Sequence, residues 1–148
     1  MDFKQTLMQS LTSARGLSGN RSKIRTVLDK FSADILEATE SKVLISYRAM
    51  FGQVIDLESM LSDIVFLDGA TEEKTETIYI HAKGIIDNKT ATLGKFSWPV
   101  VNGFPCHVEF DGSRYIAQDT EELELALKEM LASPFISQKI YNFYIEGQ

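Results

Sequence analysis

The spacing of apolar residues changes twice along this chain. It is helical near both ends, where apolar residues recur every three or four positions, and strand-like from about residue 75 to 119, where they alternate with polar residues. The strand-like part contains Asn102-Gly103 and Asp111-Gly112, two dipeptides that favour tight hairpin turns. Because helices and strands are segregated, the sequence predicts one α+β domain over residues 1–148. We expect N-terminal helices, an antiparallel sheet of four or five strands, and C-terminal helices packed on one face.

The beginning of the chain predicts two helices separated by glycines. Helical spacing over residues 2–14 indicates a short amphipathic helix with the apolar residues Phe3, Leu7, Met8 and Leu11. Gly16 and Gly19 follow, and we expect them to end this helix and form a connector. A second helix is expected from residue 20 or 21. Its apolar stripe consists of Ile24, Val27, Leu28, Phe31, Ile35 and Ala38.

The next segment is ambiguous between helix and strand. Residues 42–48 alternate and are rich in β-branched and aromatic residues, which favours a strand, while a helix that continues to Met50 is the alternative. Residues 54–67 predict a helix capped near Asp56, although their last five residues also fit a strand. The polar residues 68–76 predict an exposed loop.

The remaining elements follow from alternation and from capping residues. The expected strands are residues 77–82, 92–97, 106–110 and 114–118. Asp119 or Thr120 is expected to cap the next helix, and Ser133-Pro134 to end it and begin a last helix over residues 134–145. The apolar face of this last helix comprises Phe135, Ile136, Ile140 and Phe143, which we expect to pack on the sheet.

Charge is distributed unevenly and limits the classes of partner. The chain has a net charge of −6, yet residues 1–30 contain six basic and two acidic residues, so the other 118 residues carry −10. An acidic body repels nucleic acid and anionic lipid. The hydrophobic content of 44% is that of a globular protein. With no secretory signal pattern and no apolar run of about 20 residues, we expect a soluble, cytoplasmic protein without membrane contact.

Two histidines and one cysteine are the first residues to consider for catalysis. His81, His107 and Glu109 are expected on the polar face of the sheet, where they would form a minimal metal or catalytic cluster if their strands were neighbours. We favour the simpler interpretation, in which these residues belong to the ordinary polar surface of an antiparallel sheet. Cys106 is the only cysteine, so no disulfide forms within the chain, and we expect a buried, inert thiol.

The basic segment over residues 15–25 is a candidate for phosphate or nucleic-acid contact. Its cations are Arg15, Arg21, Lys23 and Arg25. The segment departs from the P-loop pattern in its glycine spacing and does not follow a predicted strand. A connector between two helices explains its glycines and polar residues, so we expect nucleic-acid binding to be weak.

Aromatic residues supply the candidates for a protein interface. Trp98 and Phe104 lie in a stretch with prolines at 99 and 105, which predicts a stiff loop well suited to binding. The alternative, to which we give equal weight, is that both aromatics belong to the core. Tyr141 and Tyr144 lie off the apolar face of the last helix and are further interface candidates.

The sequence therefore favours a small acidic protein that binds another protein or itself. A regulator, inhibitor or adaptor fits this description, a homo-oligomer is expected, and compact acidic proteins of this kind are common among phage and accessory-element products. No cofactor and no metal are expected. The alternatives are a small enzyme that uses His81, His107 and Glu109, and a protein that contacts nucleic acid through residues 15–25.

Overall fold

The described part of the chain forms four helices and a five-stranded antiparallel sheet. A computed structural model describes residues 2–49, 54–61 and 74–146. In chain order the elements are α1 (Phe3–Ala38), β1 (Val43–Arg48), α2 (Leu57–Met60), β2 (Thr75–Gly84), β3 (Thr90–Pro99), β4 (Cys106–Phe110), β5 (Ser113–Ala117), α3 (Thr120–Ala132) and α4 (Pro134–Glu146). This order of helix, sheet and helices confirms the predicted α+β class.

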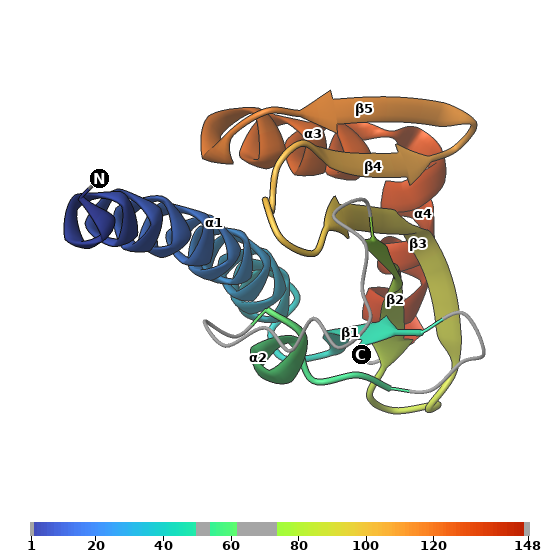
Figure 1. Cartoon of the computed structure of the whole chain (residues 1–148). Helices are drawn as coiled ribbons and strands as arrows, with labels where there is room; N and C mark the ends of the chain where they lie inside the picture. The colour runs from blue at the N-terminus through green and yellow to red at the C-terminus, as the bar shows by residue number, and fades with distance from the viewer. Residues whose placement is uncertain (1, 50–53, 62–73, 147–148) are drawn as a thin grey trace.

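The sheet is a simple meander with the helices on one face. The strand order is β1-β2-β3-β4-β5, and each strand runs antiparallel to its neighbours. Helix α3 packs on β4 and β5, α4 packs on β1, β2 and β3, and α1 contacts β1 and α3 (Figure 1). The C-terminal helices therefore cover one face of the sheet, as the sequence predicts.

The core lies between the sheet and these helices. Alternate residues of β2, β3 and β4 point into it, and the helices contribute the buried apolar residues in the second half of α1 and the buried face of α3. Its largest fully buried side chains are Trp98, Phe96, Ile24, Leu28, Leu61, Ile78, Ile80, Leu123, Met130 and Ile136. Burial of each such side chain stabilises the fold by about 1.5–3 kcal/mol.

Several local predictions are confirmed. Asp111 and Gly112 join β4 to β5 with φ of 49° and 76°, as a type I′ turn requires. The Asp119 carboxylate accepts a hydrogen bond from the Glu122 N–H at 2.9 Å and caps α3, and Pro134 begins α4. Residues 43–48 form strand β1, so the alternative of a helix continuing to residue 50 is wrong.

Other local predictions need correction. Asn102-Gly103 lies in a longer connection between β3 and β4, and only Gly103 has a positive φ, so this dipeptide does not form a two-residue hairpin turn. Asp56 caps α2 as expected, but the helix ends at Met60, and the rest of the helix predicted to residue 67 lies outside the described residues. The predicted loop at 68–76 is likewise described only from residue 74, and β2 already begins at Thr75.

The largest correction concerns the first helix. Helix α1 continues without interruption for 36 residues through Gly16 and Gly19, where a break was predicted. Neither glycine has a positive φ, and a Cβ atom at either position would meet nothing within 4 Å. A glycine inside a helix costs only about 1 kcal/mol relative to alanine. The packed second half of α1 already holds helical turns in place, so extension toward the N-terminus adds hydrogen bonds without a new nucleation cost, and the glycine cost is too small to end the helix.

We expect Gly16→Ala and Gly19→Ala each to stabilise the protein by about 0.5–1 kcal/mol, because alanine has the higher helix propensity and meets no neighbour. Urea unfolding followed by circular dichroism measures the change. Gly94→Ala is the control, since its Cβ would lie 2.7 Å from the Glu109 carbonyl oxygen and should destabilise the protein. Destabilisation by the Gly16 or Gly19 change would show that the helix does not continue through this segment.

Candidate binding surface

The first half of α1 projects from the body of the protein as an exposed helix. The core-facing stripe begins only at Ile24, and every described side chain between Phe3 and Gly16 is exposed (Figure 1). The Asp2 carboxylate caps this end by accepting a hydrogen bond from the Gln5 N–H at 3.1 Å. The helix is therefore formed from its first turn, although every described side chain of that turn is exposed.

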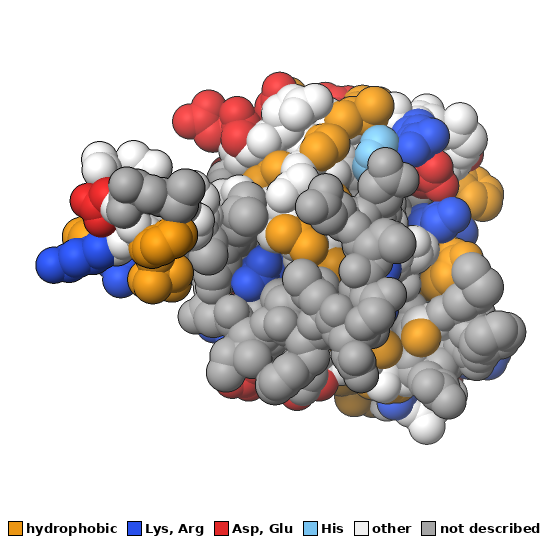
Figure 2. Space-filling view, viewed as in Figure 1, with side chains coloured by type: hydrophobic (Ala, Val, Ile, Leu, Met, Phe, Trp, Pro, Cys, Tyr) orange, Lys and Arg blue, Asp and Glu red, His pale blue; other side chains and the backbone are white. Residues whose placement is uncertain are grey.

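Large apolar side chains gather on this projecting half. Phe3 is 76% exposed, Leu7 and Met8 are each 58% exposed, and Leu11 is 59% exposed. Figure 2 shows apolar and basic side chains side by side on the projecting end of the helix. We refer to Phe3, Leu7, Met8 and Leu11 as the α1 stripe. Such a cluster of exposed apolar side chains marks an interaction site more often than an isolated exposed leucine does.

The loop that follows β3 fixes the direction in which α1 projects. The Arg21 guanidinium donates to the Val101 carbonyl at 2.9 Å, and the Asn20 side-chain amide donates to the Asn102 carbonyl at 3.1 Å. Gly103 lies directly against the helix, since a Cβ there would lie 3.1 Å from the Cβ of Asn20. The loop is therefore seated on α1.

The structure gives the two aromatic interface candidates, Trp98 and Phe104, different surroundings. Trp98 is fully buried, and its ring lies 5.5 Å from that of Phe96. Phe104 is half-buried and packs against the core. The alternative prediction, in which both aromatics belong to the core, is correct for Trp98 and largely correct for Phe104.

The four cations of residues 15–25 do not form one basic surface. Arg15 and Lys23 are exposed, Arg25 is half-buried beside Asp29 and Tyr47, and Arg21 is buried. Arg21 is therefore a structural residue that holds the loop and is not available to contact a nucleic acid. The sequence offered no sign of this role, because the carbonyl that Arg21 binds lies 80 residues further along the chain.

We expect Arg21→Ala to lower the free energy of unfolding by about 2 kcal/mol, because it leaves the carbonyl of Val101 without its charged donor. Chemical denaturation measures the loss. Lys23→Ala, an exposed position one half-turn away, is the control and should change stability by less than about 0.5 kcal/mol. Equal effects of the two substitutions would contradict the structural role of Arg21.

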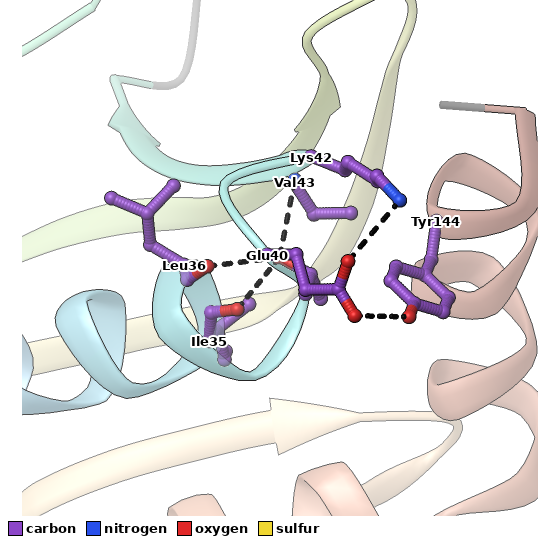
Figure 3. A network of polar contacts seen from close by, with 7 residues as sticks. Ile35, Leu36, Glu40, Lys42, Val43 and Tyr144 are labelled. Carbon is purple, nitrogen blue, oxygen red and sulfur yellow. Dashed lines mark hydrogen bonds and ion pairs between the residues drawn. The ribbon is translucent and has the colours of Figure 1, made fainter. Parts of the chain in front are cut away.

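The two C-terminal tyrosines differ in their surroundings. The Tyr144 hydroxyl donates to the Glu40 carboxylate at 3.1 Å, and the Lys42 ammonium lies 5.0 Å from its ring centroid and 3.5 Å from Glu40 (Figure 3). Tyr144 thus ties α4 to the turn between α1 and β1. Tyr141 is 53% exposed and remains available to a partner. Phe135, expected in the core, is 56% exposed.

His81 and His107 lie apart on the sheet. His81 pairs with Thr92 of β3 and His107 with Ser97, so a strand separates them and they are five residues apart along it, about 17 Å. Burial and the positive charge of Arg48 lower the pKa of His81. The Nδ1 atom of His107 lies 2.9 Å from a guanidinium nitrogen of Arg114. The described residues contain no group of three side chains suited to a metal ion.

Glu109 lines a surface pocket of about 480 Å³. The basic side chains that also line this pocket already have partners within the protein. Lys95 and Arg114 lie 3.8 and 3.5 Å from the Glu109 carboxylate, and the Lys139 ammonium donates to the Thr92 carbonyl at 2.7 Å. The Glu109 carboxylate of β4 thus pairs with cations from β3 and β5, and Lys139 of α4 binds a carbonyl of β3. The arrangement is that of an ordinary polar sheet surface.

Cys106 is buried, and its thiol lies 3.2 Å from the Gly103 carbonyl. Burial raises the pKa of this thiol to about 12. At pH 8 the native protein therefore holds about a thousandfold less thiolate than an unfolded chain, and the thiolate is the reactive form.

We expect the native protein to resist labelling by a thiol reagent at pH 8 and to be labelled fully and rapidly in 6 M guanidinium chloride. Absorbance of the released chromophore measures the two rates. Rapid stoichiometric labelling of the native protein would show that the thiol is accessible.

Comparisons with protein-family models, curated proteins and solved structures give no significant match to this chain. Within the residues that the structure describes, no helix has the length and apolar character needed to cross a lipid bilayer.

Proposed function

We propose that this protein acts by binding another protein, as a regulator, inhibitor or adaptor, and that the projecting half of α1 is the contact element. The observation that carries this proposal is the α1 stripe, which exposes four large apolar side chains on a helix that extends beyond the body. An amphipathic helix laid into an apolar groove is a common mode of recognition, and its anchors recur at the spacing of Phe3, Leu7 and Leu11.

The energetics support this use of the helix. Full burial of each of the four side chains contributes up to about 1.5–3 kcal/mol, which makes them the main favourable contribution against the cost of docking. That cost is reduced because the helix is already formed and is anchored by the buried residues Ile24 and Leu28. A partner can approach the projecting half without rearranging the domain.

We expect Leu7→Asp combined with Leu11→Asp to reduce recovery of the partner by tenfold or more without lowering thermal stability, because both positions are exposed in the free protein. Affinity capture from native lysate with quantitative mass spectrometry measures recovery, and circular dichroism measures stability.

The matched control is Gln5→Asp combined with Gln9→Asp, which adds two charges at exposed positions on the opposite side of the same helix. This control should recover the partner as the wild type does. Equal recovery by the Leu7/Leu11 variant, or no protein recovered specifically by the wild type, would refute the proposed function.

A further inference from the structure

The charges on the projecting half of α1 indicate what kind of surface it meets. Residues 3–28 contain five basic residues and no Asp or Glu. The nearest carboxylate, Asp2, is engaged in capping the helix. The helix terminus itself adds partial positive charge. Beyond the Asp2 cap, every charged side chain of the projecting half is therefore basic, on a protein whose residues after position 30 carry −10.

Two of these cations bracket part of the α1 stripe along the helix. Lys4, Met8, Leu11 and Arg15 follow one another at intervals of four, three and four residues, so they form a single row on one side of the helix. All four side chains are exposed. At a rise of 1.5 Å per residue, Lys4 and Arg15 stand about 16 Å apart, with the two apolar side chains between them.

We propose that the partner protein presents an apolar groove with carboxylates at both of its ends, about 16 Å apart, which receive Lys4 and Arg15 while Met8 and Leu11 enter the groove. This inference rests on the proposed function and names the chemistry of its partner. Charges at the rim of such a contact govern association rate and specificity, and the apolar row supplies most of the affinity.

A protein groove fits this row better than a membrane or the projecting helix of a second copy. Because the cations share the row with Met8 and Leu11, insertion of the row into a bilayer would carry them toward the hydrocarbon, and the net charge of −6 opposes anionic lipid. Pairing of two projecting halves would bring positive helices together, and a contact between two short half-helices falls below the roughly 1,200 Å² typical of stable interfaces.

The test uses the full chain and the purified protein that the wild type recovers from lysate. A carbodiimide, which joins amines to carboxylates in direct contact, should couple Lys4 to an Asp or Glu of that protein, and mass spectrometry identifies the linked peptides. In fluorescence anisotropy, Lys4→Glu combined with Arg15→Glu should weaken binding about tenfold or more, because both charges then repel the rim. The wild-type affinity should fall by a similar factor between 50 and 300 mM salt.

The control is Lys23→Glu combined with Lys30→Glu, an equal charge reversal at exposed positions of α1 outside the row, which should change affinity less than threefold. If the Lys4/Arg15 variant binds normally while the Leu7/Leu11 variant fails, this inference is overturned and the proposed function stands. If neither variant loses binding, both are overturned. Two other results would also overturn the proposed groove, provided that the Leu7/Leu11 variant abolishes them. One is binding to vesicles of phosphatidylcholine and phosphatidylglycerol, and the other is dimerisation measured by light scattering.

Discussion

The seating of the second half of α1 is the constraint on which the rest of the structure depends. Ile24, Leu28 and Phe31 are buried against the sheet layer and α3, and the Tyr47 hydroxyl of β1 donates to the Leu28 carbonyl at 2.9 Å. A helix of 36 residues is about 54 Å long, which exceeds the width of so small a domain. Once one half is seated, the other half must project into solvent, and the exposed stripe follows from that geometry.

Polar side chains that looked like surface candidates serve as internal ties. Arg21 holds the loop after β3 against α1, and Tyr144 holds α4 against the turn between α1 and β1. Both connect segments 80 or more residues apart in the chain. These ties set the orientation of α1 relative to the sheet, and so the direction in which the α1 stripe faces. The proposed contact element therefore depends on residues that take no part in binding.

The strands and the capped helices could be predicted because their signals are local. Alternation identified β2, β3, β4 and β5, and the Asp119 cap marked α3, since both depend on neighbours within a few residues. The continuity of α1 could not be predicted in this way, because Gly16 and Gly19 carry the local signal of a helix end. Their modest cost does not stop a helix that extends from turns already held in place by its packed second half. The burial of Trp98 depends likewise on how the sheet and helices meet.

By itself, the sequence determined the α+β class, the positions of most strands, and the presence of an amphipathic segment with Phe3, Leu7, Met8 and Leu11. Only the tertiary structure decided that this apolar segment stays outside the core, whereas Trp98 goes inside. The physical reason is that periodicity specifies which side of an element is apolar but not what covers it. Burial depends on the limited area of the sheet face, which α3, α4 and half of α1 already occupy.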